Sequence, residues 1–471
     1  MHSMQQLSED PAFTLDLAII GSGPGGYEAA LHAAKLGMKV CIIEKGALGG
    51  VCVNWGCIPT KALLRSAELF DQFKKSAFFG LDVEVSGINL AEAVKRSRNV
   101  ALKMSKGVGF MLRRAGVEVR QGEAIFSTPH DLDIFRDGVC SETLRARHII
   151  IASGAHSRTL PGLEPDGNRI ITSREALALK SVPDSMIVVG GGAIGVEMAW
   201  FYAMAGTAVT LVEMMPRLLP LEDEEIAEAL KRSLQKAGIR VATSAKLGNV
   251  TAEGDRVNAL LVVEGDDAEP LSAEYLLVAV GVSGNCNGLA LEHAGVEIAR
   301  GFISTDTQCR TSVRHIFAIG DVRGGMLLAH KASAEALLAV QVIAGSNPPP
   351  LDDSMIPRCV YAEPSVASIG LSEKEAEERG YRVMVGRSMF ASSGKANAYG
   401  NLEGLVKLVF NAGDRRLLGA HLLGYGAVEL IGELTLARRL EVTADLLAAT
   451  IHAHPTMSET IKEAAENARH E

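Results

Sequence analysis

Two cysteines lie close together in the segment GGVCVNWGCIPTKALL, residues 49–64. Cys52 and Cys57 follow paired glycines, and Pro59 and an apolar helical run come directly after them. Because proline suits the first turn of a helix, we expect Cys57 at a helix N-terminus, where the helix dipole favours a thiolate. The alternatives are two unrelated thiols or a metal site, but a metal site would require a second Cys/His pair at ligand spacing. The spacing therefore favours a redox-active pair.

The cysteine count and the N-terminal sequence bear on where such a pair would work. The chain has seven cysteines, and it starts with MHSMQQLSED, which resembles neither a secretory signal nor a transit peptide. We therefore expect a cytoplasmic protein, in which disulfides are usually transient and catalytic. The other cysteines are scattered, and most of them are interpreted as inert buried thiols: Cys41, Cys140, Cys286, Cys309 and Cys359.

A histidine and a glutamate near the C-terminus could supply a base. Attack of a dithiol on a disulfide requires a thiolate, and histidine is the natural proton acceptor near neutral pH. The segment HAHPTMSE offers His454, and Glu459 could bind its other ring nitrogen and fix the tautomer. Thr456 to Glu459 also fits a helix capping box, and both roles are compatible because a carboxylate has two oxygens. His452 is interpreted as structural.

Glycines at G-x-G-x-x-G spacing follow an expected strand over residues 15–20. Gly21 would allow a tight turn, Gly23 would let the backbone approach a pyrophosphate, and Gly26 would let the next helix pack on the strand. Glu44 ends the following strand, where an acid binds ribose hydroxyls. The complete pattern of strand, glycines, helix and acid predicts a dinucleotide-binding unit.

The same pattern recurs later in the chain. Gly190, Gly192 and Gly195 have the same spacing, and Glu213 follows them at the same interval as the first acid. Two fingerprints predict two dinucleotides. The carboxylate of Glu213 would accept hydrogen bonds from a free 2′-hydroxyl and repel a 2′-phosphate, which favours NAD over NADP. Arg217 is nearby and leaves NADP open.

Composition limits the remaining possibilities. The chain has 471 residues, enough for about three domains, and 47% of them are hydrophobic. The formal net charge is −9 and no basic block is present, which argues against nucleic acid as a partner. The nearly uncharged stretch from Met186 to Val212 is long enough to span a bilayer. Its glycine cluster and its change of period favour strand, turn, helix and strand instead, so no membrane span is expected.

Four segments resemble the flavin-dependent pyridine nucleotide–disulfide oxidoreductases, and the resemblance extends from about residue 15 to 468. The segments are GGVCVNWGCIPTKALL, TSVRHIFAIGDV, YAEPSVASIGLSE and HAHPTMSETIKEAA. The resemblance implies FAD and NAD as cofactors, with one FAD per subunit. It places Asp321 at the ribityl chain of the flavin, Ala329 also at FAD, and Gly281 at NAD. It also implies that Lys61 and Glu197 pair beside the reactive nitrogen of the flavin.

Within that family, CIPTKALL, Glu213 and HAHPTMSE point to the members that oxidise protein-bound dihydrolipoamide and reduce NAD⁺. The resemblance then implies that Cys52 is the outer thiol attacked by substrate and that Cys57 faces the flavin. His454 would be the base, supplied by the other subunit of a homodimer. The implied partners are lipoyl domains of acyltransferases or of glycine-cleavage carrier proteins.

Two positions depart from the family pattern. Val282 stands where an arginine is often found in the NAD loop, and Trp55 is bulkier than the valine often found between the thiols. Two other functions remain open: a related enzyme with another disulfide or a quinone as substrate, and a flavoprotein whose main role is binding.

The predicted fold is α/β, with two Rossmann-like dinucleotide-binding domains and a C-terminal α+β interface domain that forms the dimer. The FAD domain is expected over residues 1–152 and 282–345, because the chain returns to it through FAIGD. The NAD domain is expected over residues 153–281. The loop AGSNPPP marks the boundary of the interface domain, residues 346–471.

Overall fold

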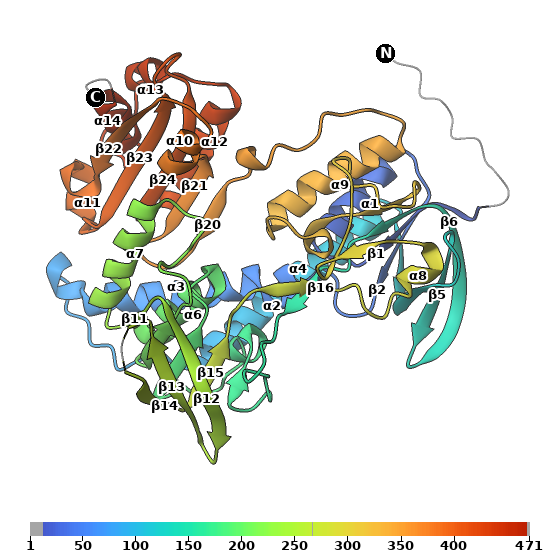
Figure 1. The fold of residues 1–471 in the computed structure, drawn as a ribbon, viewed down its shortest axis with the longest axis horizontal. Coiled ribbons are helices and arrows are strands. Elements are labelled where there is room, and N and C mark those ends of the chain that lie inside the picture. Colours follow the sequence, from blue (N-terminus) through green and yellow to red (C-terminus); the bar gives the residue numbers. More distant parts are fainter. Residues whose placement is uncertain (1–12, 266, 469–471) are drawn as a thin grey trace. The chain divides into compact units, whose positions relative to one another are not determined.

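The computed structural model describes residues 13–265 and 267–468. Their contacts divide the chain into two compact units, each assembled from several stretches of sequence (Figure 1). The first unit contains the chain up to Pro59, Arg98–His156 and Val282–Leu351. The second contains Thr60–Ser97, Ser157–Gly281 and the chain from Asp352 onward.

A seven-stranded sheet forms the centre of the first unit. Strand β1 pairs in parallel with β2 and with β6, and β19 returns from much later in the sequence to pair in parallel with β6. An antiparallel meander extends the sheet beyond β6. The order is β3 (Glu118–Gln121), β2 (Val40–Glu44), β1 (Leu15–Ile20), β6 (Val139–Ile151), β5 (Asp131–Arg136) and β4 (Glu123–Phe126), with β19 (Ile316–Ala318) beside β6.

Both faces of this sheet are buried. Along β1, Leu17 and Ile19 belong to one apolar cluster, whereas Ala18 and Ile20 belong to another. This is why the strand reads as a continuous apolar run and not as an alternating one. Helices α1 (Pro24–Lys35) and α9 (Ala329–Ile343) supply part of the first cluster and lie side by side in Figure 1. Helices α3 (Cys57–Lys74) and α4 (Leu90–Arg114) each contribute residues to both units.

The second unit contains a five-stranded parallel sheet that carries the second glycine fingerprint. Its order is β11 (Arg240–Ala242), β10 (Ala208–Val212), β9 (Ser185–Val189), β15 (Tyr275–Val278) and β8 (Ile170–Ile171). Helices α6 (Ala193–Ala205) and α7 (Glu224–Lys236) accompany it, together with the short α5 (Ser173–Ala176). A three-stranded antiparallel sheet interrupts this fold: β12 (Ala245–Glu253), β13 (Arg256–Val263) and β14 (Glu269–Ala273).

The C-terminal part of the second unit is a five-stranded antiparallel sheet with helices. Its order is β20 (Arg358–Val360), β21 (Val366–Gly370), β24 (Leu417–Gly424), β23 (Gly404–Asn411) and β22 (Val383–Met389). The helices are α10 (Glu373–Glu378), α11 (Gly394–Tyr399), α12 (Ala427–Arg439), α13 (Ala444–Ala449) and α14 (Glu459–Asn467). Apolar residues of α12 and α14 share one buried cluster with β23 and β24. The α/β architecture is therefore confirmed.

The second unit contains the stretch that was long enough to span a bilayer. The nearly uncharged stretch from Met186 to Val212 is strand β9, helix α6 and strand β10, as predicted. In the part of the chain that the structure describes, no helix has both the length and the apolar character needed to cross a bilayer. The predicted division into FAD, NAD and interface domains stays a prediction, because the second unit contains both the NAD and the interface segments.

Candidate active site

The two thiols lie on consecutive helices of the first unit. Cys52 is in α2 (Gly50–Trp55) and Cys57 is the first residue of α3, as its spacing from the proline predicted. Both residues are partly exposed. Two glycines start α2 in a left-handed conformation, with φ of 100° at Gly49 and 61° at Gly50. Side chains rarely adopt that conformation, so glycine is required at this turn.

The helix that carries Cys52 starts in contact with the first glycine fingerprint. A Cβ atom on Gly50 would lie 2.6 Å from the Cα of Gly23, so the two backbones are in close contact. The backbone N–H of Gly49 donates hydrogen bonds to the carbonyl and to the hydroxyl of Ser22, at 3.1 Å and 3.2 Å. The redox segment is therefore anchored on the loop that would hold a dinucleotide.

The first fingerprint has the geometry that a pyrophosphate requires. Gly21 has φ of 97°, and a Cβ on it would meet the carbonyl oxygen of Ala152 at 2.4 Å. A Cβ on Gly26 would meet the carbonyl oxygen of Gly21 at 2.0 Å, so helix α1 packs tightly on the strand turn. A Cβ on Gly23 would meet nothing within 4 Å. Open space at the start of a helix is where a phosphate group can approach backbone N–H groups, so the residues fit the group that the sequence predicted.

The carboxylate of Glu44 is hydrogen-bonded to the glycine turn of the first fingerprint. Its Oε2 accepts hydrogen bonds from the backbone N–H and the hydroxyl of Ser22, at 2.9 Å and 2.6 Å. Its Oε1 accepts a bond from the N–H of Gly46 at 2.7 Å. These bonds fix the carboxylate at the carboxyl end of β2, the edge where ribose hydroxyls are expected.

The second fingerprint repeats this geometry. Gly190 has φ of 111°, and a Cβ on it would meet the carbonyl oxygen of Ala279 at 2.3 Å. A Cβ on Gly195 would meet the carbonyl oxygen of Gly190 at 1.8 Å, whereas a Cβ on Gly192 would meet nothing within 4 Å. The three glycines therefore have the same three roles as in the first unit, and the residues fit a second dinucleotide.

Glu213 has hydrogen bonds equivalent to those of Glu44. Its Oε2 accepts from the N–H of Gly191 at 2.5 Å, and its Oε1 accepts from the N–H of Met215 at 2.7 Å. Arg217, the residue that left NADP open, pairs with Glu224 and also donates to the carbonyl of Pro220 at 3.2 Å. The guanidinium of Arg217 is therefore paired within the protein, although both partners are partly exposed.

The loop that follows β15 contains Gly281. This glycine has φ of 103°, and its carbonyl accepts a hydrogen bond from the N–H of Arg158 at 2.9 Å. Val282 then begins the short strand β16 (Val282–Gly284). The role of this loop at NAD stays a prediction.

Asp321 and Ala329 lie at the other end of the first unit's sequence. Asp321 is in a short 3₁₀ turn, and burial raises the pKa of its carboxyl while Lys331 opposes that shift. Ala329 is the first residue of α9. The turn is held by Glu335, which is fully buried and accepts a bond from the N–H of Gly320 at 2.7 Å. Glu335 also pairs with Lys331 at 2.8 Å.

Lys61 and Glu197 are brought together in the second unit, as the resemblance implied. Nζ of Lys61 lies 3.0 Å and 2.9 Å from the two carboxylate oxygens of Glu197. The backbone N–H of Tyr361 donates to the same carboxylate at 3.0 Å, and the ring of Tyr361 lies under the ammonium, 4.1 Å from its centroid. The side chain of Glu197 is only 6% exposed, whereas that of Lys61 is 34% exposed.

His454 and Glu459 form the pair that the sequence predicted. Nδ1 of His454 lies 2.9 Å from Oε1 of Glu459, and Oε2 of Glu459 accepts from the N–H of Thr456 at 2.9 Å. The carboxylate thus orients the ring and binds a backbone donor before α14 at the same time. The Thr456 N–H and then His454 hold the pKa of Glu459 below its usual range. The His454 side chain is 77% exposed, which leaves Nε2 accessible to a substrate.

The other histidine and the other cysteines have different surroundings. His452 is nearly buried, and its Nε2 lies 2.8 Å from Oε1 of Glu433, which agrees with a structural role. Burial raises the pKa of Cys41 and of Cys309 to about 12 and that of Cys359 to about 11, so these thiols stay protonated. Cys140, in contrast, is exposed, so it is not one of the buried thiols that were expected.

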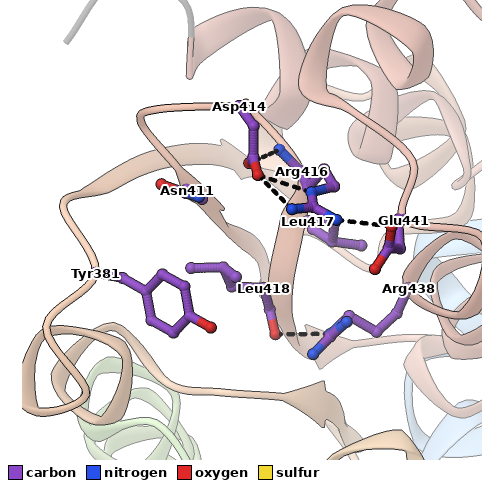
Figure 2. A pocket seen from close by; sticks show the side chains of 8 residues that line it. All are labelled: Tyr381, Asn411, Asp414, Arg416, Leu417, Leu418, Arg438 and Glu441. Atoms are coloured by element: carbon purple, nitrogen blue, oxygen red, sulfur yellow. Dashed lines mark hydrogen bonds and ion pairs between the residues drawn. The ribbon is translucent and has the colours of Figure 1, made fainter.

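A small pocket lies in the C-terminal sheet, and none of the predicted site residues lines it (Figure 2). It has a volume of about 160 Å³. Figure 2 shows that Arg416 is bound to Asp414 and Glu441, and that Arg438 donates to the carbonyl of Leu418. The charges along its wall are thus largely compensated internally. The lining residues are Tyr381, Asn411, Asp414, Arg416, Leu417, Leu418, Arg438 and Glu441.

Sequence reasoning missed several residues that hold the site. Ser22 occupies the variable position of the first fingerprint, and a hydroxyl between two glycines was the available signal. Tyr361 and Arg98 gave no local signal, because each reaches its partner only through tertiary packing. Asn54, between the two thiols, binds the backbone before α2 and could have been noticed as a buried polar residue.

Family models match nearly the whole chain. A model described as pyridine nucleotide-disulphide oxidoreductase matches residues 15–336, and the dimerisation domain of the same family matches residues 356–465. The dihydrolipoyl dehydrogenases of Chlorobaculum parvum and Chlorobaculum tepidum are each 62% identical to this chain over 462 residues, covering 98% of it and 98% of their own length. The dihydrolipoyl dehydrogenase of Rhizobium etli is 44% identical, with 96% of this chain and 98% of that protein covered.

Solved structures agree with this assignment. LpdA from Mycobacterium tuberculosis superposes with a TM-score of 0.89 at 28% identity, covering 96% of this chain and 98% of that one. The HOCl-induced flavoprotein disulfide reductase RclA from Escherichia coli, in its Cu(II) complex, gives 0.86 at 26% identity, with 96% and 99% covered. With both family models and full-length relatives in agreement, the chain belongs to the pyridine nucleotide-disulphide oxidoreductase family.

Proposed function

We propose that this FAD-dependent enzyme oxidises protein-bound dihydrolipoamide to lipoamide and reduces NAD⁺ to NADH, with release of a proton. The observation that carries the proposal is full-length identity of 62% to dihydrolipoyl dehydrogenases, in a chain that has both thiols and the paired base. Its two open glycine turns support the use of two dinucleotides. The carboxylate of Glu213 and the bound state of Arg217 support NAD over NADP.

The thiol chemistry is assigned to Cys52, Cys57 and His454. His454 accepts a proton from one substrate thiol, and the resulting thiolate attacks the sulfur of Cys52 in the oxidised pair. Cys57 leaves as a thiolate, and a mixed disulfide joins Cys52 to the substrate. The second substrate sulfur then displaces Cys52, which releases lipoamide and leaves the enzyme pair reduced. Glu459 keeps the ring of His454 oriented and stabilises it when it is protonated.

The remaining residues bind and orient. FAD, when bound, would supply a two-electron relay between the reduced thiol pair and the nicotinamide. Gly23 would hold its pyrophosphate and Glu44 its ribose. Asp321 would lie at the ribityl chain, and Ala329 would also contact FAD. Lys61, fixed by Glu197, would present a positive charge to the flavin ring.

A second nucleotide site is assigned to the second fingerprint. Gly190, Gly192 and Gly195 would receive the pyrophosphate of NAD, Glu213 its ribose hydroxyls and Gly281 the adjoining part of the nucleotide. This assignment belongs with the division into an FAD domain (residues 1–152 and 282–345), an NAD domain (153–281) and an interface domain (346–471).

The chain carries a dimerisation domain. We place His454 at the thiols of the other subunit, so that each active site of the homodimer requires both chains. The expected partners are the lipoyl domains of acyltransferases or of glycine-cleavage carrier proteins, because these bring a tethered dithiol to a separate enzyme. Turnover of isolated lipoyl domains of each kind would identify the physiological source of the substrate.

The test is replacement of each thiol in the FAD-loaded enzyme. Cys52→Ser and Cys57→Ser should each abolish oxidation of dihydrolipoamide while leaving the flavin absorbance unchanged. Cys140→Ser is the matched control, since this cysteine is exposed and lies outside the proposed site. Normal turnover by either thiol variant would contradict the proposal. Turnover of another disulfide or of a quinone, but not of dihydrolipoamide, would assign a different substrate.

A further inference from the structure

An arginine from a distant helix contacts the segment between the two thiols. The guanidinium carbon of Arg98, in α4, lies 3.8 Å from the centroid of the Trp55 ring. Nη1 of Arg98 also donates a hydrogen bond to the backbone carbonyl of Asn54. Asn54 and Trp55 are the last residues of α2 and lie between Cys52 and Cys57 in the sequence. One cation therefore binds the thiol segment through both a ring face and a carbonyl.

The side chain of Asn54 also holds this segment. The side-chain amide of Asn54 donates to the carbonyls of Ala47, Leu48 and Gly50, at 3.3 Å, 3.0 Å and 2.9 Å. Asn54 is only 6% exposed, so these bonds are shielded from water. The start of α2 is thus tied to its end, and Arg98 ties that end to α4. The residues between the two thiols are therefore held by the side chains of both Asn54 and Arg98.

The charge of Arg98 has a predictable electrostatic effect. The last carbonyl groups of a helix lack donors within the helix, and they give its C-terminal end a partial negative charge. Arg98 satisfies one of these carbonyls and offsets that charge beside the thiol segment. Arg98 is held on Asn54 and Trp55, which lie between the two cysteines in the sequence. A cation beside a cysteine favours the thiolate over the thiol, so we expect Arg98 to favour the reduced pair over the disulfide.

We propose that Arg98, stacked on Trp55, is a positioning residue that holds the thiol segment and stabilises the reduced, thiolate-bearing form of the Cys52–Cys57 pair. The inference rests on the proposed function, in which these two cysteines are the redox couple. It also gives a reason for Trp55, which stands where valine is often found in the family. An indole ring offers the guanidinium a π face, and valine offers none.

The test measures the equilibrium of the couple: the disulfide takes up two electrons and one proton to give one thiol and one thiolate. The FAD-loaded enzyme is equilibrated without oxygen in buffers of reduced and oxidised dithiothreitol, then alkylated, and the alkylated fraction is measured by mass spectrometry. Arg98→Met should shift the equilibrium about tenfold toward the disulfide, which is about 30 mV toward more negative potential. Alkylation of its reduced pair should also require a higher pH.

Matched variants separate the charge and the stacking from general damage. Arg98→Lys keeps the charge but loses the planar stack, so its shift should be smaller. Trp55→Val should reproduce part of the shift, and adding Arg98→Met to it should shift the couple by less than the sum of the single changes. Arg96→Met is the control, because Arg96 is also in α4 and binds a backbone carbonyl, that of Ala62, outside the thiol segment.

The outcomes separate this inference from the proposed function. If the wild-type pair does not cycle between disulfide and dithiol, the proposed function fails. If it cycles, and Arg98→Met leaves both the equilibrium and the pH dependence of alkylation unchanged, the inference on Arg98 is wrong. Should Arg98→Met fail to bind FAD, Trp55→Val decides: an unshifted couple in that variant overturns the inference.

Discussion

Nδ1 of His454 lies 2.9 Å from Oε1 of Glu459, while the other oxygen of the same carboxylate binds the backbone N–H of Thr456. The backbone bond fixes the carboxylate, and the carboxylate in turn holds the imidazole through Nδ1. The ring itself is largely exposed. This pair carries the proton-transfer role in the proposed reaction.

Replacing the ring should abolish proton transfer without unfolding the protein. His454→Gln should lower kcat for dihydrolipoamide oxidation by about 10²- to 10⁴-fold, with bound flavin unchanged, since a general base contributes that much. Glu459→Gln should also lower kcat, by a smaller factor, because the ring loses the carboxylate that orients it. Steady-state rates of both variants measure these effects, and an unchanged kcat in Glu459→Gln would contradict the role of Glu459.

His452→Gln provides the contrast. His452 is nearly buried and bound to Glu433, so its loss should lower the stability of the fold by about 1 kcal/mol and leave kcat nearly unchanged. Thermal unfolding and steady-state rates of the same preparation distinguish the two histidines. A large fall in kcat in this variant would mean that the catalytic role was assigned to the wrong ring.

Glu213 should set the preference for NAD over NADP. Glu213→Gln removes the charge that repels a 2′-phosphate and weakens the bonds to ribose, so the ratio of kcat/KM for NAD to that for NADP should fall by about tenfold. Glu224→Gln is the second variant, because it releases Arg217 from its partner and should lower the same ratio. Unchanged ratios in both variants would show that discrimination lies elsewhere.

The ion pair of Lys61 and Glu197 should contribute to the free energy of unfolding. Lys61→Met leaves the nearly buried carboxylate of Glu197 without its cation and should destabilise the protein by about 1–3 kcal/mol, less than a fully buried pair because Lys61 is partly exposed. Adding Glu197→Leu removes the stranded charge and should recover part of that loss. Urea unfolding of the two single variants and the double variant gives the coupling energy, and additive effects would exclude a direct pair.

A cluster of three histidines should make the protein sensitive to acid. The rings of His130 and His315 stack 3.7 Å apart, and burial lowers the pKa of His148 beside them to about 4, with His315 and Arg147 adding to the shift and Asp16 opposing it. An unfolded histidine titrates near 6.5. Below that pH the unfolded chain binds more protons than the folded one, so stability should fall as pH drops from about 6.5 to 4.

His148→Leu removes this group and should reduce the loss of stability in that pH window. The measurement is the thermal midpoint at several pH values between 7 and 4.5. His156→Leu, at an exposed histidine, is the control and should follow the wild type. A His148→Leu curve parallel to the wild-type curve would contradict the assignment.

The sequence alone determined the features whose geometry is local. The glycine spacing fixed both dinucleotide turns, because the tight turn, the open position and the close helix contact are set within a few residues of one strand end. Strand β1 was predicted at its observed bounds, because its run of apolar residues is also a local feature of the sequence. His454 and Glu459 are five residues apart, so a single turn of chain brings them together.

Only the tertiary structure decided which distant side chains complete these local motifs. Glu197 meets Lys61 from 136 residues away and Tyr361 from 164, and Arg98 reaches Asn54 from 44. Arg217 pairs with Glu224. Periodicity and spacing do not encode such pairings, because they depend on how separate helices and strands pack. The sequence thus supplied the chemical groups, and packing fixed the charges that surround them.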